Sequence, residues 1–298
     1  MLLGKGDGTF EAQKRFSMGR TTLGAELAVA DFDRDGNLDI ATGNSVLLGR
    51  GDGTIAAPNR FAAAHAESLS LISADFDGDG SLDLASSFRN DADEFDDISV
   101  FLGRGDGSFA GARSKVVGGG IYSFTSADFD ADGSLDLAVA HYRFEYVSVL
   151  LGRGDGTFVP PKRVPMRGDS FGIVSADFDG DGDQDLAVSE RTVVDRENGV
   201  YSGNMAMLLN NGDGSFDTQQ RFALGDTPQY AASADLNGDG RPDIAAVIPA
   251  SDAVSVLLNA TNASPQSKAD CKNGGYREFG FKNQGRCIAF INKAAYGQ

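Results

Sequence analysis

A nine-residue acidic string occurs five times in this chain of 298 residues and limits what the chain can fold into. Its pattern is Asp-x-Asp-x-Asp-Gly-x-x-Asp, with copies that begin at Asp31, Asp75, Asp128, Asp177 and Asp235. A second string, close to LLGRGDGTF, begins at Leu2, Leu47, Phe101, Leu150 and Leu208. The acidic copies are 44, 53, 49 and 58 residues apart, which indicates a repeated supersecondary unit with loops of variable length.

Each repeat contains short apolar runs of the length and composition of β-strands. One run leads into the acidic string, one follows it, one precedes the glycine-rich turn, and a weaker one follows that turn. The runs are rich in Val, Leu, Ile and Phe and lack a sustained helical period. Four antiparallel strands in each repeated unit predict an all-β fold, a β-propeller of about five four-stranded blades over residues 1–260. A truncated larger propeller is the alternative.

The acidic string has the residue types of a calcium loop. Side chains at positions 1, 3, 5 and 9 can place oxygens around one point, and the carbonyl at position 7 can complete the shell. Gly at position 6 allows the sharp turn, and hard oxygen ligands suit calcium. EF-hands need a Glu at position 12, where this chain has Thr42, Ser86, Val139, Val188 and Ala246. The remaining alternative is that the Asp-Gly pairs only form hairpin turns.

The chain resembles the FG-GAP/VCBS repeat family, the calcium-loop propellers also found in integrin α-subunits and secreted bacterial proteins. The resemblance implies calcium, up to five ions, between the first two strands of each blade. The fifth copy has Asn237 in place of an Asp, so we expect the weakest site there. The implied metal-site residues are Asp31, Asp33, Asp35, Asn37 and Asp39; Asp75, Asp77, Asp79, Ser81 and Asp83; Asp128, Asp130, Asp132, Ser134 and Asp136; Asp177, Asp179, Asp181, Asp183 and Asp185; and Asp235, Asn237, Asp239, Arg241 and Asp243.

The charge balance limits the partners and the compartment. With 43 acidic and 26 basic residues the formal net charge is -17, which argues against nucleic acid and anionic membranes as partners. No apolar run approaches the ~18 residues of a membrane-spanning helix, so we expect no membrane insertion. Extracellular calcium modules bind with dissociation constants of about 0.1–1 mM. Such sites fill outside the cell, so we expect a secreted or cell-surface protein of bacterial type.

The two ends of the chain depart from the repeat. The first residues, MLLGKGDGTF, begin inside a repeat, and our interpretation is that a signal peptide and further blades precede them. The segment after Thr9 can supply the fourth strand of the last blade and close a ring. Residues 261–270 form a polar linker, and residues 271–298 a small segment with Cys271 and Cys287. This segment resembles short tails on secreted bacterial proteins, and its two cysteines can form a disulfide or remain free thiols.

The loops that differ between repeats are the candidate ligand surface. Connections between the second and third strands vary most, as in residues 88–97, 140–146 and 190–204. The segment 141–146 gives the candidates His141, Tyr142, Arg143 and Tyr146. We expect a non-catalytic binding or adhesion module for an unknown protein or glycan. The alternatives are an accessory or catalytic part of a polysaccharide-degrading lyase or hydrolase, and a structural spacer. Arg-Gly-Asp at Arg50, Arg104 and Arg153 belongs to the repeated turn, so we interpret it as structural.

Overall fold

The computed structural model describes residues 2–16, 27–61, 68–88, 96–195 and 200–259. They form β-strands joined by turns, with one short 3-10 turn, η1 (Pro249–Ser251). Cys271, Cys287 and residues 261–270 lie outside the described residues, so their predictions remain untested. In the part of the chain that the structure describes, no helix has the length and apolar character needed to cross a bilayer.

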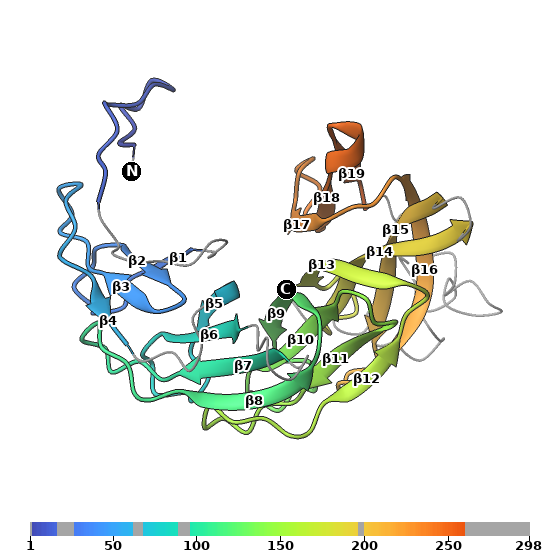
Figure 1. The fold of residues 1–298 in the computed structure, drawn as a ribbon, viewed down its shortest axis with the longest axis horizontal. Helices are drawn as coiled ribbons and strands as arrows, with labels where there is room; N and C mark the ends of the chain where they lie inside the picture. The colour runs from blue at the N-terminus through green and yellow to red at the C-terminus, as the bar shows by residue number, and fades with distance from the viewer. Residues whose placement is uncertain (1, 17–26, 62–67, 89–95, 196–199, 260–298) are drawn as a thin grey trace, which may run out of the picture. The chain divides into compact units, whose positions relative to one another are not determined.

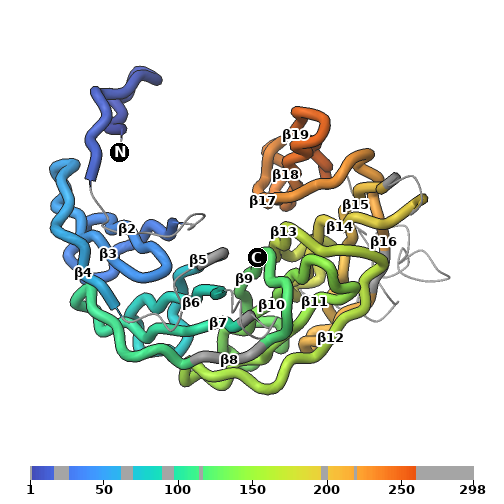
Figure 2. Tube along the Cα trace, in the orientation of Figure 1, coloured from blue at the N-terminus to red at the C-terminus, as the bar shows by residue number. Residues whose placement is uncertain are grey.

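The strands form five antiparallel sheets, each a simple meander in chain order (Figures 1 and 2). Sheet 1 contains β1 (Ala28–Ala30), β2 (Asp39–Thr42), β3 (Ser45–Leu47) and β4 (Asn59–Arg60); sheet 2 contains β5 (Ser68–Ala74), β6 (Asp83–Phe88), β7 (Asp96–Phe101) and β8 (Arg113–Gly118). Sheet 3 contains β9 (Ile121–Ala127), β10 (Asp136–His141), β11 (Tyr146–Leu150) and β12 (Lys162–Pro165). Sheet 4 contains β13 (Asp169–Ala176), β14 (Asp185–Asp195), β15 (Val200–Asn210) and β16 (Phe216–Gly225); sheet 5 contains β17 (Tyr230–Ala234), β18 (Asp243–Ile248) and β19 (Ala253–Leu257).

The repeated strings determine where these strands begin and end. In every sheet the first strand leads into the acidic string, and the second strand begins at its last Asp. In sheets 1 to 3 the glycine-rich string follows the third strand and is closed by a β-bridge between its first Gly and its last residue, as in Gly103–Phe109; in sheet 4 Asn210 pairs with Phe216 at the same place. The same bridge, Gly4–Phe10, closes the N-terminal copy of the string.

The described residues divide into two compact units. The first comprises residues 1–126, 133–144 and 148–162, and the second comprises residues 127–132, 145–147 and 163–298. Sheets 1 and 2 belong to the first unit and sheets 4 and 5 to the second, while the residues of sheet 3 are shared between them. Sheet 5 has three strands among the described residues, and residues 11–16 form no strand. The predicted closure of a ring by this segment therefore remains a prediction.

Apolar side chains fill the layers between successive sheets. Between sheets 1 and 2 the layer includes Phe32, Leu84, Phe88 and Phe101, all at most 2% exposed. Within each unit the first strands of successive sheets contact one another, β1 with β5 and β13 with β17. Sheets that pack face to face around their first strands are the arrangement of propeller blades.

The acidic loop and the glycine-rich turn of one sheet lie at the same end of that sheet. The first Gly of the turn packs against the loop so closely that a Cβ on Gly103 would lie 2.2 Å from the carbonyl oxygen of Leu82. Gly49 and Gly152 make the same approach to Leu38 and Leu135, at 2.2 and 2.3 Å. At Gly4, the N-terminal equivalent, nothing lies within 4 Å of such a Cβ. In these three repeats the backbone of the acidic loop therefore leaves no room for a side chain at this position, whereas the fourth and fifth repeats have Asn210 and Asn259 there.

We predict that Gly103→Ala lowers the free energy of unfolding by about 1–3 kcal/mol, because the added methyl group forces backbone apart. The matched substitution Gly4→Ala, at the same position of the same string, should leave stability unchanged. Urea unfolding of the two variants beside the wild type measures both effects. Equal losses would show that the close approach is not what requires glycine.

Candidate metal centres

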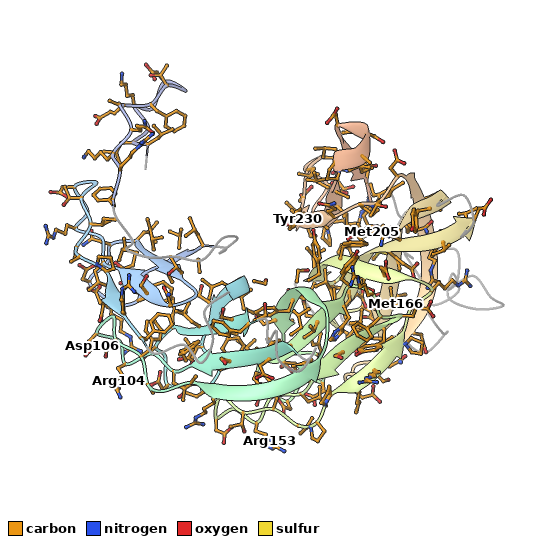
Figure 3. The ribbon with its side chains drawn as sticks, viewed as in Figure 1. Arg104, Asp106, Arg153, Met166, Met205 and Tyr230 are labelled. Atoms are coloured by element: carbon orange, nitrogen blue, oxygen red, sulfur yellow. The ribbon has the colours of Figure 1, made fainter. Side chains whose placement is uncertain are left out.

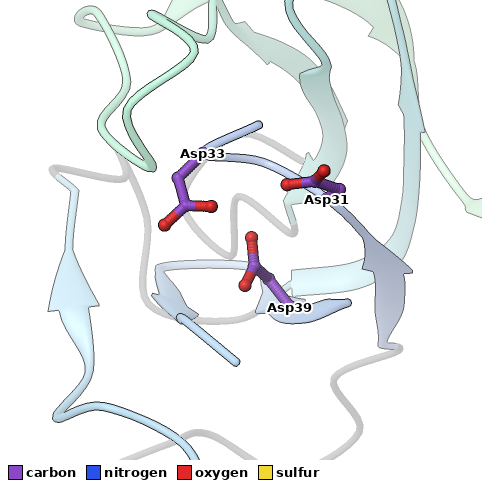
Figure 4. Close-up of side chains that lie close together, drawn as sticks. All are labelled: Asp31, Asp33 and Asp39. Carbon is purple, nitrogen blue, oxygen red and sulfur yellow. The ribbon is translucent and has the colours of Figure 1, made fainter. Parts of the chain in front are cut away.

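Acidic loops bring carboxylates together at the sheet ends. In three loops, each contained in one unit, the carboxylates at positions 1, 3 and 9 each offer an oxygen, and these oxygens lie within 4.8 Å of one another. In the first loop these are Asp31, Asp33 and Asp39, whose side chains point toward one another (Figure 4). The equivalent groups are Asp75, Asp77 and Asp83, and Asp177, Asp179 and Asp185.

The carboxylate at position 9 is buried and joins two segments of its sheet. Asp83 is 0% exposed; its Oδ2 accepts the amide N–H of Phe76 at 2.8 Å, and its Oδ1 accepts that of Gly103 at 2.7 Å. One side chain therefore ties the acidic loop to the end of the third strand. The same two bonds occur at Asp39 (2.8 and 2.7 Å), Asp185 (3.0 and 2.8 Å) and Asp243 (3.0 and 2.7 Å).

The carboxylate at position 1 orders the turn itself. Asp31 accepts the amide N–H groups of Asp35 and Gly36 at 3.1 and 2.9 Å. The repeated Gly at position 6 is needed here because Gly36 has φ +86°, in the left-handed region that favours glycine. Because these bonds leave lone pairs on the oxygens, the carboxylates at positions 1 and 9 can still face a cation.

Position 5 lies outside the groups of close carboxylates, and its role as a ligand stays a prediction. Asp35 is exposed, and it accepts the amide N–H of Asn37 at 2.8 Å and the side-chain amide of Asn37 at 2.9 Å. These bonds hold the pKa of Asp35 below its ordinary value. Asp79 behaves alike, with a bond of 2.6 Å from the amide of Ser81. The close groups therefore contain positions 1, 3 and 9, while position 5 bonds to position 7.

The loop in sheet 3 is divided between the two units, so its ligand set remains a prediction. Asp128, Asp130 and Asp132 belong to the second unit, where Asp128 accepts the amide of Asp132 at 3.2 Å. Ser134 and Asp136 belong to the first, where Asp136 accepts the amide of Gly152 at 2.7 Å.

Burial and mutual repulsion oppose ionisation of the crowded carboxylates. Burial raises the pKa of Asp83 to about 6 and, with the charges of neighbouring carboxylates, that of Asp185 to about 7. Burial and the charge of Asp185 also raise the pKa of Asp179. The Oδ2 atom of Asp179 is buried and accepts no hydrogen bond. An oxygen-only donor set with an unsatisfied buried carboxylate oxygen fits a hard cation.

The fifth loop differs in charge and exposure. Asp235 is exposed, and backbone hydrogen bonds, chiefly from Gly240, lower its pKa. Arg241 at position 7 pairs with Asp239 at 2.7 Å, which lowers the pKa of Asp239. With Asn237 at position 3, this loop has one carboxylate fewer and its own internal cation. Both features support the expectation that it holds a metal ion least tightly.

The predicted ligand-face residues have different environments. His141 is 0% exposed, and its ring nitrogens lie 2.9 Å from the carbonyl oxygen of Gly119 and 2.9 Å from the hydroxyl of Ser148. In the first unit the guanidinium of Arg143, an exposed residue, lies 5.2 Å from the ring centre of Tyr142. In the second unit Arg163 lies 4.3 Å from the ring centre of Tyr146. His141 therefore supports the loop from inside, whereas the other three residues are at least partly accessible.

A further group lies in the predicted variable segment 190–204 of sheet 4, although its individual residues were not predicted. Arg191 of β14 lies between two rings, 4.6 Å from the centre of Tyr201 and 5.4 Å from that of Phe171, and forms a 2.5 Å ion pair with Asp169. The only signal in the sequence was the unusual length of the segment between the second and third strands.

The Arg-Gly-Asp tripeptides form turns, as interpreted. Asp106 accepts the amide and hydroxyl of Ser108 at 2.9 and 2.5 Å, while Arg104 is exposed in the same turn (Figure 3). Asp52 and Asp155 make the same two bonds to Thr54 and Thr157.

We predict that Asp83→Ala in metal-free protein lowers the free energy of unfolding by at least about 2 kcal/mol, because two buried amides lose their acceptor. Asp79→Ala, in the same loop but exposed, should cost much less. Urea unfolding in chelator separates the structural role of position 9 from any role in metal binding. Equal losses for the two variants would contradict the role assigned to position 9.

The comparisons with known proteins agree with this architecture. The model of the FG-GAP-like repeat matches residues 1–42, 75–139, 128–188 and 198–246. No curated protein sequence matches the chain.

Solved structures resemble this chain at low sequence identity. A lectin from Agrocybe aegerita, described as recognising non-reducing terminal N-acetylglucosamine, aligns over 87% of this chain and 74% of its own with a TM-score of 0.52 and 19% identity. A periplasmic gluconolactonase from Pseudomonas aeruginosa aligns over 86% of this chain and 89% of its own, with a TM-score of 0.43 and 14% identity. The predicted all-β propeller fold is confirmed. Its repeated strings and meander sheets, together with family matches over more than half of its length, show that the chain belongs to the FG-GAP-like repeat family.

Proposed function

We propose that the protein is a secreted or cell-surface, calcium-stabilised β-propeller that binds a glycan or protein ligand without catalysis. The calcium part of the proposal rests on the crowded carboxylates. Bound cations at these loops would stabilise the ionised carboxylates, and their affinity would become part of folding stability. Sites of about 0.1–1 mM affinity fill outside the cell, which supports the proposed location.

The binding part rests on one observation, the aromatic–arginine group on the β14–β15 hairpin. Tyr201 is 45% exposed, and Val193, its direct partner across the hairpin, is 46% exposed. Since side chains two residues apart point to the same face of a strand, Arg191 shares the face of Val193 and Tyr201. Tyr and Arg are enriched among residues that dominate binding energy, and Tyr can stack on a sugar ring.

This group lies on a rigid base. Glu190, the neighbour of Arg191 on β14, is fully buried and paired with Arg221 at 2.8 Å. The ion pair between Arg191 and Asp169 fixes the guanidinium while the ring of Tyr201 stays accessible. Tyr142, Arg143 and Tyr146 belong to the proposed binding loops as well, and His141 positions the chain beneath them.

We predict that calcium raises the melting temperature and changes its pH dependence. In metal-free protein the folded pKa values of about 6 for Asp83 and about 7 for Asp185 exceed the ordinary 3.8, so the folded state binds more protons than the unfolded state. Stability should therefore fall as the pH rises from about 4 to about 8. Excess calcium should remove most of this fall, because it replaces the protons.

We would measure thermal unfolding in chelator and in calcium across this pH range. Calorimetric titration with calcium would count the sites. We expect the fifth loop to bind most weakly, so Asp235→Ala should leave the calcium-dependent rise nearly intact while Asp177→Ala reduces it. If calcium neither binds nor shifts the melting temperature, the acidic strings are only turns, and the argument for export falls.

We predict that Tyr201→Ala weakens ligand binding about tenfold or more, while Tyr201→Phe retains most of it, since the ring supplies the contact. The calcium-loaded wild type is first tested on a glycan array and on a panel of extracellular proteins. Arg104→Ala, in the exposed turn beside the acidic loops, is the control and should bind normally. Loss of binding in Arg104→Ala with normal binding in Tyr201→Ala would place the ligand at the other end of the sheets. Soluble fragments released from a polysaccharide would instead establish an enzyme.

A further inference from the structure

A pair of phenylalanines recurs where one sheet packs against another. The Phe at position 2 of an acidic loop packs edge to face against the Phe that closes a glycine-rich turn further along the chain. The carbonyl of the first Phe also accepts the amide of the last Gly in that turn. The pairs are Phe32 and Phe109 (5.9 Å between ring centres), Phe76 and Phe158 (6.1 Å), and Phe129 and Phe216 (5.5 Å), with backbone bonds from Gly107, Gly156 and Gly214 of 3.1, 3.1 and 3.0 Å.

Phe178, at position 2 of the fourth loop, faces a cavity in the corresponding place. The described residues of the second unit leave about 340 Å³ there, between sheets 4 and 5. Its lining includes Phe178, Met207, Leu209, Phe222, Pro242 and Ile244. By their place in the repeat these correspond to Phe32, Val46, Leu48, Phe61, Leu82 and Leu84 of the first unit.

In the first unit the equivalent space is filled by Phe109. This ring belongs to the same apolar cluster as Leu48 and Leu82, with 5.1 Å between its centre and that of Phe61. The cavity beside Phe178 is therefore the space that the Phe of a glycine-rich turn fills elsewhere in the chain.

The wall of the cavity also carries the contact that such a turn makes. Leu209 of sheet 4 lines the cavity and corresponds to Leu48 and Leu102, whose side chains lie against the last Gly of the glycine-rich turn in the next repeat. Asn259, the last described residue, reaches the carbonyl of Phe178 with its side-chain amide at 2.8 Å. Among the residues described, no glycine-rich turn follows β19.

The N-terminal hairpin, residues 2–10, is a folded turn of the required kind. The amide of Lys5 donates to the carbonyl of Thr9 at 2.9 Å, and Asp7 accepts the amide of Thr9 at 2.9 Å, as in the other copies. Its closing residue, Phe10, is 58% exposed, whereas Phe158 and Phe216 are 5% and 9% exposed.

We propose that the hairpin of a second copy of this chain docks into the cavity, with Phe10 against Phe178. The donated segment is residues 5–10, because Leu257, Leu258 and Asn259 of the acceptor already occupy the places of Leu2, Leu3 and Gly4 in the repeated string. The N-terminal hairpin and the cavity are different surfaces of one chain, so the association is head to tail. It can therefore continue from copy to copy or close into a ring of copies.

The test uses one variant of the hairpin and one of the cavity. Phe10→Ala removes the ring that would enter the cavity, and Gln220→Trp fills the cavity from its exposed rim. Light scattering after gel filtration in calcium should show the wild type above the 31.2 kDa of one chain, increasingly so with concentration, and each variant as a monomer. A mixture of the two variants should give dimers and nothing larger. The Gln220→Trp variant keeps an intact hairpin and the Phe10→Ala variant keeps an intact cavity, so only one contact can form. Arg104→Ala, at an exposed residue outside this contact, should associate like the wild type.

The proposal fails if the wild type stays monomeric at every concentration, which would mean that residues 260–298 or the chain's own hairpin fill the cavity, or that nothing does. It also fails if Phe10→Ala still associates, or if the mixed variants stay monomeric. Melting curves of both variants show whether a monomeric result comes from a folded protein.

Discussion

The buried carboxylate at position 9 of the acidic string is the interaction on which each sheet depends. In the second sheet Asp83 accepts one amide from the acidic loop and one from the end of the third strand, so the two turns at that end are held together. Burial beside other carboxylates opposes its ionisation, as its raised pKa shows. A cation bound between the carboxylates would reduce that opposition. The same atoms can therefore stabilise the sheet and bind metal.

The sheets and the positions of the close carboxylates could be predicted from sequence because both depend on short-range spacing. The nine-residue string fixes a turn, and alternating apolar runs fix strands on either side. Position 5 could not be predicted from spacing alone, since the Asp35 side chain satisfies the backbone and side-chain amides of Asn37 instead of joining Asp31 and Asp33. Which amides the Asp35 side chain accepts depends on the local backbone geometry, and the spacing of the residues does not determine it.

Contacts between repeats were harder to anticipate than contacts within them. The Phe at position 2 and the Phe of the glycine-rich turn each looked like ordinary core residues, and only the packing of sheets pairs them, as with Phe32 and Phe109. The variable loops show the same limit. A segment rich in aromatic and charged residues drew attention to His141, which is buried, while Arg191 and Tyr201 meet because their strands are unusually long.

The fifth loop shows how a repeat can change its chemistry while keeping its fold. Asp243 keeps both hydrogen bonds of position 9, so the link to the third strand is preserved. Arg241 supplies a positive charge to Asp239 at 2.7 Å, and Asn237 removes one negative charge. In a repeat protein each unit is stabilised by itself and by its neighbours. A loop whose charges are balanced internally makes the folding of its sheet depend less on a bound cation.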